Sequence, residues 1–133
     1  MGTHSLITFI DGDQAITTVY RQFDGYPSGR GKELATFLAS KRMVNGYMND
    51  FGPIRTETNG MGCLAAQWIA HEKDGVGNVY IYPPNIEDND CGAEFHYWVS
   101  GDGSKPLTVA VTADEPLFEG NVDEFVAWVE GYA

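Results

Sequence analysis

The stretch LITFIDGDQAITTVYRQF, residues 6–23, decides the fold class. Its two β-rich runs, Leu6–Ile10 and Ile16–Phe23, are joined by the turn Asp11-Gly12-Asp13. Glycine accepts the positive φ that a tight turn between antiparallel strands needs, so this pattern predicts a β-hairpin.

Two helices are predicted after the hairpin. A glycine-rich segment, residues 24–31, opens the first, whose apolar residues fall roughly on one face: Leu34, Phe37, Leu38, Val44 and Met48. Asn45-Gly46 is predicted to end or kink this helix, and residues 49–58 are predicted to form a loop. The second helix is expected to run from an N-cap at Asn59 to about His71, with a buried stripe of Met61, Leu64, Ala65 and Trp68.

Three more strands and a last helix complete the predicted fold. The strands are Val79–Tyr82, Ala93–Val99 and Leu107–Thr112, each bounded by turn residues. Asn121 and Glu124 have the spacing of a capping box before an apolar stripe of Val122, Phe125, Val126 and Val129. The sequence therefore predicts one α+β domain over residues 1–133, a largely antiparallel sheet of about five strands with about three helices packed on it.

The composition indicates a soluble, cytosolic protein. Of the 133 residues 43% are hydrophobic, yet no run approaches the ~20 apolar residues of a membrane span, and no secretory signal is present. Cys63 and Cys91 lie far apart without a CxxC motif, so we expect both thiols to be unpaired, as in a reducing compartment.

The net charge of −11 is unevenly distributed. Residues 1–66 carry six bases and six acids, whereas residues 67–133 carry thirteen acids and two bases, Lys73 and Lys105. Phosphate contacts need clustered Lys and Arg, so direct nucleic-acid binding is not expected. The acidic half is interpreted either as a solubilising surface or as a surface that docks onto a basic protein.

The glycine-rich segment is the strongest candidate site. It leads into a predicted helix N-terminus, where free N–H groups and the helix dipole favour a phosphate or carboxylate, although it matches neither the Walker A nor the dinucleotide pattern. The alternative is a turn that only joins strand to helix. In a ligand site the arginines would bind phosphate, the tyrosine would stack on a base and the aspartate would accept a hydrogen bond. The candidate ligand-binding residues are Arg21, Asp24, Tyr26, Arg30 and Lys32.

Catalytic and metal chemistry have weaker signals. Cys63 lies in the first turn of the second predicted helix, where a thiol can become a nucleophile. His71 is eight residues further along, about 12 Å away at 1.5 Å per residue, too far to act as its base. The acidic segment Asp88–Gly92 with Glu94 does not meet the EF-hand pattern. We therefore expect no catalytic residue, metal or cofactor.

Three segments carry a resemblance to a known family: MGTHSL at residues 1–6, YRQFDGYPSGRGKEL at 20–34 and GMGCLAAQ at 60–67. They resemble a family of uncharacterised small phage and bacterial proteins that start MGT-R-SL and carry a Y-R-Q-x-D-G-Y-P-x-G-x-G block. His4 stands where that family has Arg, and the acidic second half is matched loosely. The resemblance implies a phage context, in which small accessory proteins often block a bacterial defence protein or sequester a nucleotide signal.

Together these observations favour a non-enzymatic, phage-type accessory protein of the anti-defence class in the host bacterial cytoplasm. It is expected to bind or sequester a small anionic, nucleotide-like ligand, without direct contact to nucleic acid or membrane. The alternative is an acidic inhibitor that docks onto a basic host protein such as a CRISPR effector. A small enzyme using Cys63 is the least favoured interpretation, and a homo-oligomer is compatible with either binding function.

Overall fold

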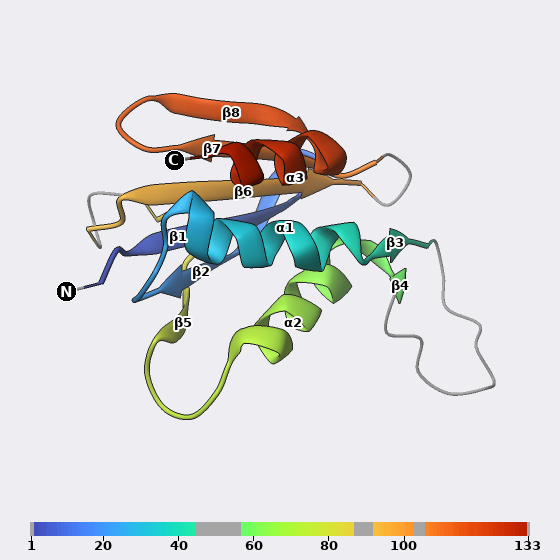
Figure 1. The fold of residues 1–133 in the computed structure, drawn as a ribbon. Helices are drawn as coiled ribbons and strands as arrows, with labels where there is room; N and C mark the ends of the chain where they lie inside the picture. Colours follow the sequence, from blue (N-terminus) through green and yellow to red (C-terminus); the bar gives the residue numbers. More distant parts are fainter. Residues whose placement is uncertain (1, 45–56, 87–91, 103–105, 133) are drawn as a thin grey trace.

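A computed structural model describes residues 2–44, 57–86, 92–102 and 106–132 (Figure 1). A six-stranded sheet has the order β5-β2-β1-β6-β7-β8, and its neighbouring strands are antiparallel except for the parallel pair β1–β6. The strands are β1 (Ser5–Asp11), β2 (Gln14–Arg21), β5 (Val79–Tyr82), β6 (Phe95–Gly101), β7 (Thr108–Thr112) and β8 (Pro116–Asn121). The α+β class is confirmed, and the sheet has one strand more than expected.

The predicted hairpin supplies two inner strands of this sheet. β1 and β2 pair antiparallel, and Gly12 in the turn adopts a φ of 66°. Because successive side chains alternate between the faces of a strand, Ile7, Phe9 and Val19 share one face. These side chains are buried in the core.

Helices α1 (Lys32–Ala39), α2 (Gly60–Glu72) and α3 (Val122–Gly131) pack against this apolar face (Figure 1). The predicted stripe of α2 is buried as expected, although the side chain of Asn59 does not cap the helix. In α3 the capping box is confirmed: the Glu124 amide donates to Asn121 Oδ1 at 2.8 Å, and the Asn121 amide donates to Glu124 Oε1 at 2.9 Å. No helix in the described ranges is long and apolar enough to cross a membrane.

The opposite face of the sheet has a buried polar cluster. Thr8 Oγ1 lies 2.8 Å from Thr18 Oγ1 and 2.7 Å from His96 Nε2. Thr18 also donates to the carbonyl of Pro84, in the connection from β5 to β6. All three side chains have hydrogen-bond partners, which offset the cost of burying their polar groups.

Three predictions about the helices and strands were wrong: one helix was too long, and the β3–β4 pair and β8 were missed. The first helix ends at Ala39 and does not include Val44, because Ser40 Oγ bonds the Phe37 carbonyl and the chain then enters β3 (Arg42–Met43). β3 pairs with β4 (Glu57–Thr58), where a loop was expected. β8 was not predicted; its Pro and Gly are poor strand formers, and its pairing with β7 overrides that preference.

The remaining boundary differences are small. β6 begins and ends two residues later than the predicted strand Ala93–Val99. Met48, Asn45-Gly46 and most of the predicted loop 49–58 lie outside the described residues, as do Cys91 and residues 88–90.

Candidate functional site

The glycine-rich segment is already helical from Pro27. Residues Pro27–Gly31 form one π-helical turn that continues directly into α1. The amides of Gly29 and Arg30 donate to the carbonyls of Tyr26 and Asp24. Gly25 is buried, donates to the Thr3 carbonyl at 2.8 Å and accepts a hydrogen bond from the Tyr97 hydroxyl at 2.7 Å. These amides therefore do not form the open set of N–H groups that the sequence suggested.

Arg21, at the end of β2, lies in a buried ion pair with Glu72 at the end of α2. The side chains are 10% and 6% exposed, respectively, and Arg21 Nη1 bonds Glu72 Oε1. Burial lowers the pKa of Arg21, and it raises the pKa of Glu72. In each case the partner's charge opposes the shift. Burial dominates both shifts, and Arg21 Nε has no hydrogen-bond partner.

The other turn residues form a second, more exposed group. Arg30 Nη1 bonds the Glu33 carboxylate one turn along the helix, and Arg30 Nη2 lies 4.0 Å from Asp24 Oδ2. The Tyr26 hydroxyl donates to Asp24 Oδ1 at 3.4 Å. Four of the five predicted site residues thus interact with side chains of this protein.

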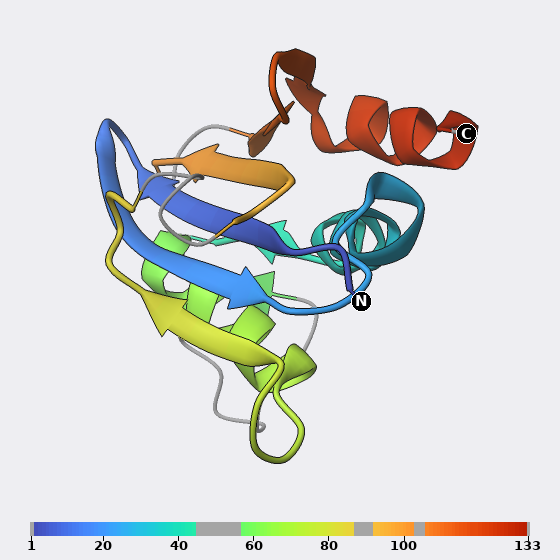
Figure 2. The same cartoon turned by 90° about the vertical axis from the view of Figure 1, so that its left-hand side faces the viewer.

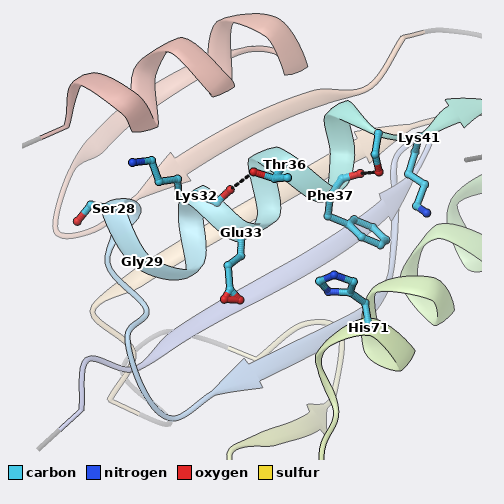
Figure 3. A pocket seen from close by; sticks show the side chains of 9 residues that line it. Ser28, Gly29, Lys32, Glu33, Thr36, Phe37, Lys41 and His71 are labelled. Carbon is cyan, nitrogen blue, oxygen red and sulfur yellow. Dashed lines mark hydrogen bonds between the residues drawn. The ribbon is translucent and has the colours of Figure 1, made fainter.

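A groove of about 560 Å³ runs along α1 and reaches the end of α2 (Figure 3). Figure 3 shows Phe37 pointing toward His71, with Lys41 beside them and Lys32 near the other end of α1. The Lys41 ammonium lies 4.9 Å from the centre of the Phe37 ring, and that ring lies 5.4 Å from the His71 ring. The lining residues are Ser28, Gly29, Lys32, Glu33, Thr36, Phe37, Ser40, Lys41 and His71.

Lys32 is the one predicted site residue that lines this groove. Sequence reasoning missed Lys41, Phe37 and His71, because the helix packing that brings them together has no local signal. Phe37 and Trp68 pack edge-to-face with ring centres 5.1 Å apart, and Trp68 stacks on His71. His71, which lines the groove, is therefore held against Phe37 and Trp68 while its side chain stays 54% exposed.

The sequence also raised a catalytic thiol and a metal site. Cys63 carries a free thiol on α2. No group of three or more His, Cys, Asp or Glu side chains in those ranges is placed to hold a metal ion.

Comparison with known proteins finds no matching family, no matching curated protein and no matching solved structure.

Proposed function

We propose that this protein is a non-enzymatic, phage-type accessory protein that binds a small anionic, nucleotide-like ligand in the groove along α1. The observation that carries this proposal is the pairing of two lysines with aromatic surface in one groove of about 560 Å³. Ligand pockets are commonly about 300–1,000 Å³ and combine apolar surface with a few polar groups.

The charge of the groove favours an anion. Lys32 and Lys41 line it, and Glu33, the one carboxylate among the described lining residues, is ion-paired with Arg30. Lys32 is the first residue of α1 and Lys41 follows its end, so the lysines lie at opposite ends of a helix of eight residues, about 12 Å long. They would therefore contact separate parts of a ligand. His71, whose side chain is 54% exposed, would contact its ring, and Phe37, which is 5% exposed, would support His71 from beneath.

In this arrangement the two arginines support the groove. Arg30 neutralises Glu33 at the groove wall, and Arg21 holds the end of α2 through Glu72, next to His71. Tyr26 and Asp24 remain candidates for ligand contacts at the turn, because both are exposed.

The test is a thermal-unfolding screen with cyclic and linear nucleotides. A ligand present at 100 times its dissociation constant adds about 2.7 kcal/mol to the stability, which raises Tm by several degrees. Lys32→Gln and Lys41→Gln should each weaken binding about tenfold or more, because a hydrogen bond to a charged group contributes about 1.5–3 kcal/mol.

Arg42→Gln is the matched control. It removes the same charge next to Lys41 in sequence, but the Arg42 side chain is exposed, pairs with Glu57 and does not line the groove. Stabilisation that all three variants retain would contradict the proposed site. Turnover of the ligand would contradict a non-enzymatic function, and no stabilisation by any nucleotide would contradict the ligand class.

A second candidate function is inhibition of a basic host protein. Residues 106–132 contain no Lys or Arg. Their six acids are exposed on the β7–β8 turn, β8 and α3: Asp114, Glu115, Glu119, Asp123, Glu124 and Glu130. A purified basic host protein should bind less tightly as salt rises, and Glu115→Lys should weaken the complex while Lys32→Gln leaves it intact. Binding that is insensitive to both salt and Glu115→Lys would exclude this function.

A further inference from the structure

The two edges of the sheet differ in how well they are protected. Native edge strands commonly avoid pairing with other chains through charges, proline or bulges. β8 has Pro116, Glu119 and a shift in its register with β7. β5, with the sequence VYIY, has no charge and no proline, and its register with β2 is regular. β5 is therefore the edge with less protection of its own: Lys73 covers the Val79 end of the strand, and the Ile81 end has no such cover among the described residues.

Apolar side chains are exposed along this edge. Ile81 is 65% exposed and Tyr80 is 45% exposed, and Val76 is fully exposed in the loop that precedes the strand. Tyr80 also belongs to an aromatic row on one face of the sheet. Tyr20 on β2 stacks on Tyr82 with ring centres 5.1 Å apart and lies 6.0 Å from Tyr80.

The backbone geometry identifies the group that is open for pairing. The Gln22 amide donates to the Asn78 carbonyl, so Asn78 faces β2. Backbone groups alternate between the two sides of an antiparallel strand, so Val79 and Ile81 face outward. The Val79 amide donates to the Gly77 carbonyl, and the Val79 carbonyl accepts a hydrogen bond from Lys73 Nζ at 2.9 Å. Ile81 thus presents the outward N–H and C=O groups.

We propose that β5 pairs antiparallel with β5 of a second copy of this chain, around a two-fold axis at Ile81. In this register the two Ile81 residues exchange N–H···O bonds and their side chains meet on one face. Tyr80 lies opposite the partner's Tyr82 on the other face, where aromatic cross-strand pairs are stabilising. In this register Val79, whose carbonyl already accepts from Lys73, lies opposite the partner's Pro83, which has no N–H to donate, so the pairing is confined to residues 80–82. The contact closes as a symmetric dimer.

The acids of β8 and α3 do not oppose self-association at this edge, whereas Asp74, exposed in the loop five residues before β5, is the nearest described acid to it in sequence. β5 and β8 lie at opposite ends of the sheet, five strand spacings or about 24 Å apart (Figure 2). That distance is about three Debye lengths at physiological ionic strength, so the acids near β8 are screened from the dimer axis. In a second copy of the chain, Ile81 would meet Ile81 on one face and Tyr80 would meet Tyr82 on the other.

Sedimentation velocity of the full chain over a wide concentration range tests the proposal. The wild-type protein should form a dimer whose fraction rises with concentration. Ile81→Lys should stay monomeric, because it places two like charges at the axis, and its Tm at low concentration should be unchanged. Glu119→Lys, which introduces the same side chain at the β8 edge, should dimerise like the wild-type protein. A wild-type protein that is monomeric at every concentration would overturn the proposed β5–β5 dimer, as would a dimer that Ile81→Lys leaves intact.

Hydrogen exchange of the wild-type protein supplies a test that needs no variant. The Ile81 amide faces outward and should exchange rapidly at low concentration, then become protected as the dimer forms. The Tyr80 amide faces β2 and should be protected throughout. An Ile81 amide that stays unprotected in a dimeric sample would show that the copies associate through another surface.

Discussion

Replacing the buried Arg21–Glu72 ion pair by apolar residues should stabilise this protein. The side chains are 10% and 6% exposed, so both charges have lost most of their hydration. Burial lowers the pKa of Arg21 and raises the pKa of Glu72, and for buried ion pairs the cost of desolvation can exceed the attraction between the charges. The double variant Arg21→Met with Glu72→Leu removes both charges and keeps similar volumes.

The expected gain is about 2 kcal/mol, within the range of about 1–4 kcal/mol seen when buried ion pairs are replaced by apolar side chains. Part of it comes from Arg21 Nε, which is buried without a hydrogen-bond partner. Such a group costs about 1–3 kcal/mol. Arg30 and Glu33 lie close enough to interact with both members of the pair, which moderates the gain.

Urea unfolding of the wild-type and double-variant proteins across pH is the assay. A carboxyl whose folded-state pKa is raised contributes stability that is fully present below its ordinary pKa and is lost as pH rises through the raised value. The advantage of the double variant should therefore widen as pH rises from below that ordinary pKa toward neutrality. A double variant that is less stable than wild type at neutral pH would refute the reasoning, as would an advantage that shrinks with rising pH.

Three further substitutions test the packing. Asn121→Ala removes a capping-box side chain and should lower the free energy of unfolding by about 1 kcal/mol in urea unfolding, and a change below experimental error would argue against the cap. Trp68→Ala should cost about 3–5 kcal/mol by the same assay, because Trp68 is 1% exposed beneath Phe37 and His71. Gly25→Ala should cost about 1–3 kcal/mol, since its Cβ would lie 2.6 Å from Ser5 Cβ. Gly62→Ala on α2 is its control, because its Cβ meets nothing within 4 Å; equal losses in both would contradict the close contact.

The sequence predicted those parts of the fold that local chemistry determines. The hairpin follows from Gly12 between two β-rich runs, and α3 follows from the Asn121 and Glu124 spacing. β8 and the β3–β4 pair were missed because partner strands stabilise them and their own composition does not. The first helix was predicted too long for a related reason: Val44 keeps the helical apolar spacing, but the chain at Arg42–Met43 pairs with β4.

The candidate site could be predicted only in part. Residue types at the glycine-rich turn predicted an anion site, but a sequence does not show which carboxylates lie opposite its arginines. Glu72 is 51 residues from Arg21, and Glu33 is three residues from Arg30. The anion site was inferred from a predicted helix N-terminus with Arg30 and Lys32 beside it, and that inference did not consider the pairing of Arg30 with Glu33. Lys41 and His71 enter the site through the contact between α1 and α2, which lies beyond any local motif.

The distribution of charge over the fold connects the three proposals. Acids gather on β8 and α3, two lysines line the groove along α1, and β5 itself has no charged residue, although Lys73 bonds its Val79 carbonyl. An anionic ligand approaching a chain of charge −11 is repelled at long range, so its affinity depends on short-range contacts with Lys32 and Lys41. Added salt weakens both the long-range repulsion and the short-range attraction, but more strongly the repulsion, because it acts across more than a Debye length. Ligand binding in the groove should therefore depend on salt far less than the docking of a basic protein at the acidic end, which distinguishes the two candidate functions in one titration.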